Sequence, residues 1–154
     1  MKSVNNFIDF EASIIPWLGK TSKMADCFLQ EKLKEKGLDL SKEQVVVLKK
    51  LHEKDGLNQN ELAFLTLRDK STLTRLLSKM ENKKYIQRIR SKEDKRISQV
   101  FLTEEGRNIY TKTTPVLRDL LDSLGKGITI EEKELTIRIL KKVQVNMGVN
   151  ADSL

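Results

Sequence analysis

The stretch Asp69-Lys70-Ser71-Thr72-Leu73-Thr74-Arg75-Leu76-Leu77-Ser78-Lys79-Met80 decides the fold. Its apolar side chains follow the i, i+3, i+4, i+7 spacing of one helix face, at Leu73, Leu76, Leu77 and Met80. Asp69 is a candidate N-cap, because its carboxylate can accept a hydrogen bond from a free amide of the first turn. The pattern predicts a helix from Lys70 to about Lys83. Its opposite face is polar and comprises Ser71, Thr72, Thr74, Arg75, Ser78 and Lys79.

Three more helix starts are marked by capping boxes, in which an N-cap oxygen is followed three residues later by Glu or Gln. Ser41 with Gln44 predicts a helix to about Glu53, Asn58 with Glu61 a short one to about Thr66, and Thr129 with Glu132 one to about Asn146. The short helix therefore precedes the helix from Lys70 by one tight turn.

Two short runs rich in β-branched and aromatic residues follow, at residues 85–89 and 97–102, with a polar connection at 91–95. They predict a β-hairpin. Helix, turn, helix and hairpin in this order describe a winged helix-turn-helix, whose second helix enters the DNA major groove. A helical hairpin with a solvated basic face is the structural alternative.

Long helices are predicted on both sides of this unit. Upstream, Pro16 suits a first turn, and one face carries Trp17, Leu18, Thr21, Met24, Ala25, Phe28, Leu29 and Leu33 before Gly37 ends the helix. Downstream, Thr103 caps a helix to about Gly125, in which Pro115 predicts a kink rather than a break. Residues 1–12 are too poor in apolar side chains to fix a period and are interpreted as an arm.

Charge is concentrated in the centre of the 154-residue chain. Residues 57–102 carry eleven basic and five acidic side chains, a net +6 out of a total of +7. This density favours a polyanionic partner, although a basic surface that only maintains solubility explains the charge equally well. No apolar run reaches the ~20 residues of a membrane span, and no leader pattern begins the chain, so we expect a cytoplasmic protein without membrane contact.

The sequence contains few of the residue types that catalysis and metal binding require. His52 is the single histidine and Cys27 the single cysteine, which is too few for a zinc site of His and Cys ligands. We expect His52 to be structural and Cys27 to be an inert thiol on the buried apolar stripe of the first helix. We therefore expect no enzyme, no cofactor and no metal.

Five segments of the sequence carry a family resemblance. The segments are Leu40-Ser41-Lys42-Glu43-Gln44, Glu61-Leu62-Ala63, Asp69 to Leu77, Asp94-Lys95-Arg96 and Leu102-Thr103-Glu104-Glu105-Gly106. In this order and spacing they resemble the MarR family of bacterial transcriptional regulators. The resemblance implies a mainly α-helical fold with a small β-hairpin wing. It also implies one domain, in which residues 1–37 and 103–154 form a helical dimerisation region and residues 38–102 the winged helix-turn-helix lobe.

The resemblance further implies a homodimer on a pseudopalindromic site in double-stranded DNA. Thr74 and Arg75 match the family's recognition-helix pair, and Asp94 and Arg96 match its wing motif, in which the arginine enters the minor groove and the aspartate helps to orient it. With the polar helix face and the nearby cations, the candidate DNA contacts are Ser71, Thr72, Thr74, Arg75, Ser78, Lys79, Lys84, Arg90, Asp94 and Arg96. Lys84 departs from the glycine that the family often has before the first wing strand.

Family members commonly bind small aromatic or amphipathic effectors between the dimer helices and the DNA lobe. By position Trp17, Thr21, Val47 and Leu48 are candidates to line such a site, and core packing explains them at least as well. Cys27 lies too late in the chain to match the family's peroxide-sensing cysteine. The leading hypothesis is a ligand-responsive repressor. The alternative is a winged-helix module that binds RNA or an acidic protein.

Overall fold

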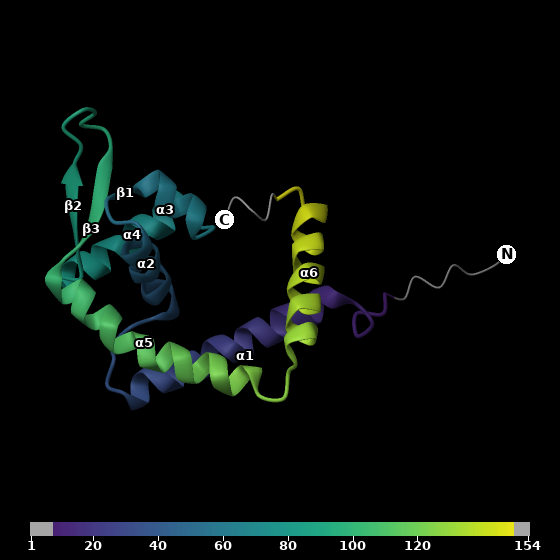
Figure 1. Cartoon of the computed structure of the whole chain (residues 1–154). Coiled ribbons are helices and arrows are strands. Elements are labelled where there is room, and N and C mark those ends of the chain that lie inside the picture. Colours follow the sequence, from purple (N-terminus) through teal and green to yellow (C-terminus); the bar gives the residue numbers. More distant parts are fainter. Residues whose placement is uncertain (1–7, 150–154) are drawn as a thin grey trace.

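The computed structural model describes residues 8–149, which form six helices and a small sheet (Figure 1). In chain order these are α1 (Ile14–Glu35), α2 (Lys42–Glu53), β1 (Leu57–Asn58), α3 (Gln59–Leu65), α4 (Lys70–Asn82), β2 (Ile86–Arg90), β3 (Ser98–Leu102), α5 (Glu104–Gly125) and α6 (Ile130–Asn146). Each predicted helix and both hairpin strands are confirmed. Residues 1–7 of the expected arm lie outside the described residues.

The predicted caps define the helix starts. Ser41, Asn58 and Thr129 each form a complete capping box with the Gln or Glu three residues later. Asp69 accepts from the amide of Thr72 at 2.9 Å. Each cap satisfies backbone donors that the helix itself leaves unpaired, which is why local sequence was sufficient to place these starts.

The sheet contains one strand more than the predicted hairpin. Its antiparallel order is β1-β3-β2, with Leu57 opposite Val100, and Arg88 opposite Val100 on the other side. β1 is only two residues long, and one of them, Asn58, is also the N-cap of α3. No periodic signal can be read from two residues, so the sequence did not predict this strand.

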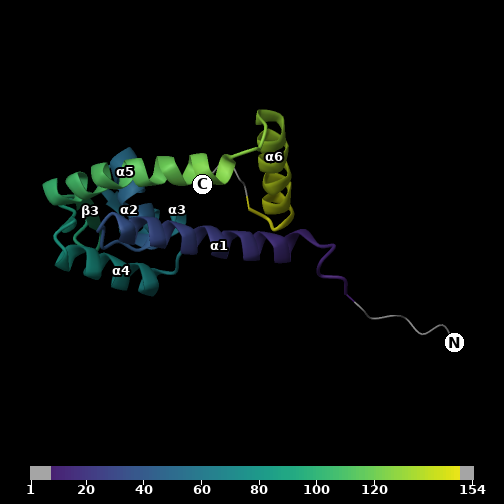
Figure 2. The ribbon, with the colours of Figure 1, turned by 90° about the horizontal axis from the view of Figure 1, so that it is seen from below.

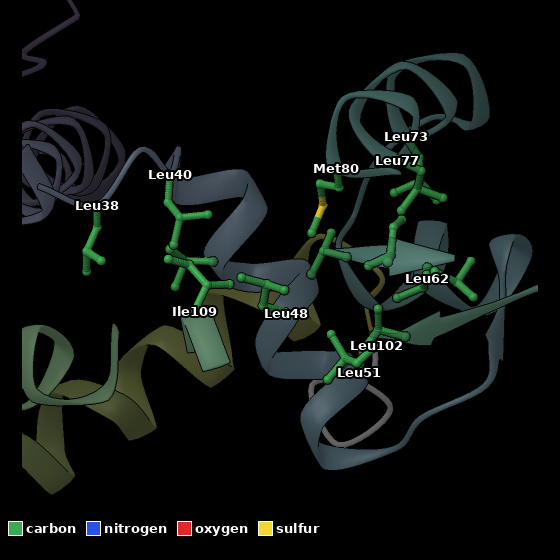
Figure 3. Close-up of a cluster of buried hydrophobic side chains, with 14 of the residues drawn as sticks. Leu38, Leu40, Leu48, Leu51, Leu62, Leu73, Leu77, Met80, Leu102 and Ile109 are labelled. Atoms are coloured by element: carbon green, nitrogen blue, oxygen red, sulfur yellow. The ribbon is translucent and has the colours of Figure 1, made fainter. Parts of the chain in front are cut away.

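The core lies where α2, α3 and α4 meet the sheet (Figure 3). Leu48, Leu51, Leu62, Leu73 and Leu77 are fully buried there. The same apolar cluster continues into α1 and α5. From α1 it includes Leu29 and Leu33, and from α5 it includes Ile109, Val116 and Leu120. The segment from α2 to β3 is therefore packed directly onto the helices before and after it.

The helices α1 and α5 lie side by side and extend away from the lobe, and α6 turns off the end of α5 (Figures 1 and 2). α5 runs through Pro115 as one helix. Within the described chain, α6 has no buried residue. Its Leu135, Ile137, Ile139 and Val145 are all exposed, as is its C-cap residue Met147.

The apolar stripe of α1 is buried only at its C-terminal end. Leu29 and Leu33 are in the core, whereas Trp17 and Met24 are exposed. The expectation that Cys27 lies on a buried stripe is wrong for the single chain, because its side chain is exposed. The predicted helical period of α1 is confirmed, but α5 covers only part of the apolar face of α1. Among residues 8–149, no helix is long and apolar enough to cross a membrane.

Candidate nucleic-acid interface

The polar face of α4 points away from the core, as the periodicity predicted. Ser71, Thr74, Arg75 and Lys79 are exposed, and Thr72 and Ser78 are half-buried. Leu73, Leu77 and Met80 on the opposite face are fully buried. The helix is therefore held by its apolar stripe, and its polar face is presented to solvent as a fixed surface.

Two of the predicted contact hydroxyls are engaged at the start of α4. Ser71 Oγ donates to Asp69 Oδ1 at 2.7 Å, and Thr72 Oγ1 donates to Asp69 Oδ2 at 2.6 Å. With the amide of Thr72, these bonds hold the pKa of Asp69 well below its usual range, the side-chain bond from Thr72 being the largest cause. In the free protein, Ser71 and Thr72 thus stabilise the first turn of α4.

The next two hydroxyls form a chain along the helix. Thr74 Oγ1 donates to the carbonyl of Lys70 at 2.8 Å and accepts from Gln59 Nε2 at 3.3 Å. Ser78 Oγ donates to the carbonyl of Thr74 at 3.0 Å and accepts from Arg88 Nη2 at 3.2 Å. Ser78 therefore has a partner in the wing, which its position in the sequence did not indicate.

The cations of α4 have no such partners. Within residues 8–149, neither Arg75 nor Lys79 takes part in an ion pair, and both are exposed. An exposed guanidinium can donate two parallel hydrogen bonds to the edge of a guanine, and an ammonium can bind a phosphate.

The wing holds Arg90, Asp94 and Arg96, all exposed. Its tip is closed by the amide of Ser91 donating to the carbonyl of Ile97 at 2.8 Å. Asp94 Oδ1 accepts from the main-chain amide of Arg96 at 2.9 Å. Asp94 thus acts on Arg96 through the backbone of the turn, and no ion pair joins the two side chains in the described structure.

Lys84 occupies the left-handed backbone region, with φ +61°. It follows Lys83, the C-cap of α4, and its side chain is exposed. Its carbonyl accepts from Thr103 Oγ1, which links this turn to the start of α5. The turn geometry expected of a glycine is kept, and a lysine adopts it at the cost of backbone strain.

A hollow of about 240 Å³ brings together α3, α4 and residues 96–98 of the wing. Its lining includes Asn58, Gln59, Asn60, Lys70, Thr74 and Arg96, and contains no acidic residue. Sequence reasoning missed Gln59, Asn60 and Lys70. Lys70 was the first residue of a predicted helix and Gln59 followed a capping residue, but only the packing of α3 against α4 shows that they lie beside Arg96.

The four candidate effector residues do not share a cavity. Val47 and Leu48 are fully buried in the core, and Trp17 and Thr21 are exposed on α1. Thr21 instead lines a separate groove of about 820 Å³ between α1 and α5, with Met24, Cys27, Phe28 and Leu124. His52 stacks against Tyr110 at 4.7 Å between ring centroids. No cluster of three metal-ligating side chains occurs among the described residues.

Comparisons with known proteins agree with this architecture. The sequence profile of the MarR family matches residues 40–98. The chain is 32% identical over 116 residues to the HTH-type transcriptional regulator YybA of Bacillus subtilis, covering 73% of this chain and 75% of that protein. It is 36% identical over 110 residues to the regulator SarZ of Staphylococcus haemolyticus, covering 70% and 72%.

Among solved structures, a mutant MarR from E. coli complexed with operator DNA is 28% identical to the chain. It superposes with a TM-score of 0.78 and covers 83% of this chain and 91% of its own.

Proposed function

The chain belongs to the MarR family of transcriptional regulators, and we propose that it binds double-stranded DNA sequence-selectively as a homodimer on a pseudopalindromic operator. In this proposal α4 enters the major groove and the wing follows the adjacent minor groove. Ser71, Thr72, Thr74, Arg75, Ser78, Lys79, Lys84, Arg90, Asp94 and Arg96 remain the proposed interface. The DNA complex of the related MarR supports this assignment.

One observation carries the proposal. Arg75 and Lys79 are exposed and unpaired within the described chain, on a helix whose other face is fully buried. Because the buried face holds the helix backbone, only the side chains themselves lose conformational freedom when these cations bind a base edge or a phosphate. The wing adds Arg90 and Arg96 as further exposed cations of the same lobe.

The homodimer is supported by apolar surface that the chain does not cover. Ile137 and Val145 on α6, Trp17 on α1 and Leu121 on α5 are between 47% and 69% exposed. Large apolar side chains exposed in this number are typical of protein interfaces. We assign residues 1–37 and 103–154 to the dimerisation region, and residues 38–102 to the DNA-binding lobe.

We further propose that the protein is a cytoplasmic, ligand-responsive repressor rather than an enzyme. The groove beside Thr21 and Phe28 is mostly apolar, which suits a small aromatic or amphipathic effector. Trp17, Val47 and Leu48 do not line it, so among the four candidate residues the groove supports Thr21 alone.

The test is a binding titration with three nucleic acids of equal length: a duplex selected by the protein from a random pool, a scrambled duplex and a single-stranded RNA. Salt dependence alone would not discriminate, because every polyanion releases counterions. We expect at least about a thousandfold preference for the selected duplex over the scrambled one at physiological salt. Equal affinity for all three, or preference for the RNA, would support the interaction-module alternative.

A further inference from the structure

Arg88 of the wing is bound to α4 by four hydrogen bonds. Its Nη2 and Nε donate to Glu81 Oε2 at 2.6 and 3.1 Å, and its main-chain amide donates to Glu81 Oε1 at 3.2 Å. Nη2 also donates to Ser78 Oγ at 3.2 Å. One carboxylate thus holds both the side chain and the backbone of the same strand residue, which fixes the position and the rotation of the strand at that point.

The main-chain bond explains why the strand needs this carboxylate. β2 is an edge strand in the order β1-β3-β2, so one side of it has no strand partner. An unpaired edge amide must find another acceptor or water. Glu81 supplies that acceptor from α4, and the helix thereby takes the place that a neighbouring strand would have.

The alternation of side chains along β2 determines where the contact between Arg88 and Glu81 lies on the strand. Ile86, Arg88 and Arg90 share one face of the strand, because side chains alternate between faces. Ile86 is buried in the core, Arg88 is held by α4, and Arg90 is exposed. The contact therefore lies between the buried base of the wing and its exposed cations.

Charge maintains the contact at neutral pH. The bond from the Arg88 side chain lowers the pKa of Glu81, so the carboxylate remains ionised well into the acidic range. Both side chains are partly shielded from solvent, with 23% of Arg88 and 38% of Glu81 exposed. A bond between ionised groups is also shorter and stronger than a neutral one.

We propose that Arg88 is a positioning residue for DNA binding: held by Glu81 and Ser78, it sets the angle of the wing on α4, so that the wing cations and the polar face of α4 meet one DNA segment together. The inference rests on the proposed DNA-binding function. It gives Ser78 a second role, in the support of the wing, beside its proposed DNA contact.

The test is a pair of double-mutant cycles on the selected duplex. Arg88→Met removes the charge and keeps most of the stem, and we expect it to weaken binding roughly tenfold, the scale of one lost specific contact. In an Arg96→Ala background the additional loss should be smaller, because one of the wing contacts that Arg88 positions is already absent. In an Arg75→Ala background it should persist in full. Equal losses in both backgrounds, or no loss at all, would overturn the proposal.

Glu81→Gln separates positioning from direct contact. If Arg88 itself bound a phosphate, releasing it from Glu81 would leave affinity unchanged or raise it. If Arg88 positions the wing, Glu81→Gln should weaken binding as Arg88→Met does. Arg107→Met is the matched control, because Arg107 of α5 pairs with Asp55 rather than with a residue of α4, and its loss should leave affinity for the duplex unchanged.

Hydrogen–deuterium exchange of the free protein provides a readout without DNA. In the Glu81→Gln variant, residues 86–102 should exchange faster while α2 keeps its wild-type protection. Unchanged exchange in the wing would contradict the positioning role. Wild-type protein that binds no duplex selectively would overturn the proposed function and this role with it, whereas selective wild-type binding with an unaffected Arg88→Met variant would overturn this role alone.

Discussion

Gly106 in the first turn of α5 lies directly against the carbonyl oxygen of Tyr85, which precedes β2. A Cβ at position 106 would stand 1.9 Å from that oxygen and 2.9 Å from its carbon. The amide of Thr103 donates to the same carbonyl at 3.1 Å, so the oxygen is held in place. This close approach fixes where the base of the wing meets the long helix that leads to the proposed dimer region.

We predict that Gly106→Ala destabilises the fold by about 3 kcal/mol, because backbone atoms must move to admit the methyl group. Asn108→Ala is the control: it lies on the exposed side of the same helix, and its effect should stay within about 0.5 kcal/mol. Urea unfolding of the three proteins measures both values. An alanine tolerated at 106 as well as at 108 would show that the contact is not close-packed.

Lys84→Gly should stabilise the fold by about 1 kcal/mol, since glycine adopts a positive φ without strain. It should also weaken DNA binding through the lost charge. Lys84→Asn separates these effects, because asparagine tolerates the same conformation and is neutral. Lys83→Gly should instead destabilise the fold. The φ of Lys83 is −78°, which needs no glycine, and Lys83 Nζ donates to the carbonyl oxygen and to Oδ2 of Asp39, each at 2.7 Å. Thermal melting and DNA titration of each variant check these signs.

The cap at Asp69 predicts a pH dependence. Its pKa is lower in the folded protein than the ~3.9 of an unfolded chain, so the unfolded chain binds protons first as the pH falls. Its stabilisation is therefore complete above about pH 4 and is lost progressively below it. Asp69→Asn keeps a capping oxygen but no charge, so the wild-type advantage in urea unfolding should be constant from pH 7 to 5 and shrink towards pH 3. A constant difference down to pH 3 would contradict the charged cap.

Replacing Arg75 and replacing Arg96 should impair DNA binding in different ways. Arg96→Ala should weaken binding evenly across sequences and lower the salt slope by about one per half-site, as expected for loss of one cation. Arg75→Ala should instead reduce discrimination at particular base pairs by roughly 1 to 3 kcal/mol. Because Asp94 bonds the amide of Arg96, Asp94→Ala should partly reproduce Arg96→Ala, and Asp94→Asn, which retains an acceptor oxygen, should not. Titrations at several salt concentrations distinguish these patterns.

The exposed apolar residues of α6 predict the oligomeric state. Ile137→Glu should shift the protein from dimer to monomer at micromolar concentration, because it places a charge among apolar side chains that we assign to the interface. Gln87→Glu introduces the same charge at an exposed wing position and should leave the dimer intact. Sedimentation equilibrium of both variants provides the measurement. A dimer that is indifferent to both changes would place the interface elsewhere.

Local signals account for what the sequence predicted. Helix caps and apolar periods act within one or two helical turns, so they can be read from a short stretch of sequence. This is true of the apolar period of α4 and of the N-caps at Ser41, Asn58, Asp69 and Thr129. The strand β1 was missed because only its partner β3 defines it. The hydrogen bond between Arg88 and Ser78 and the exposure of Cys27 depend on how separate elements pack together, which no spacing rule encodes.

The exposed face of α4 is proposed to read bases within a symmetric site. Sequencing the duplexes that wild-type protein and the Arg75→Ala variant each select from one random pool provides the most direct test. We predict that wild-type protein enriches an inverted repeat with half-sites about 10 base pairs apart, centre to centre. The variant should enrich the same repeat with lost preference at one symmetric pair of positions. Enrichment of no symmetric motif, or identical motifs for both proteins, would contradict the claim.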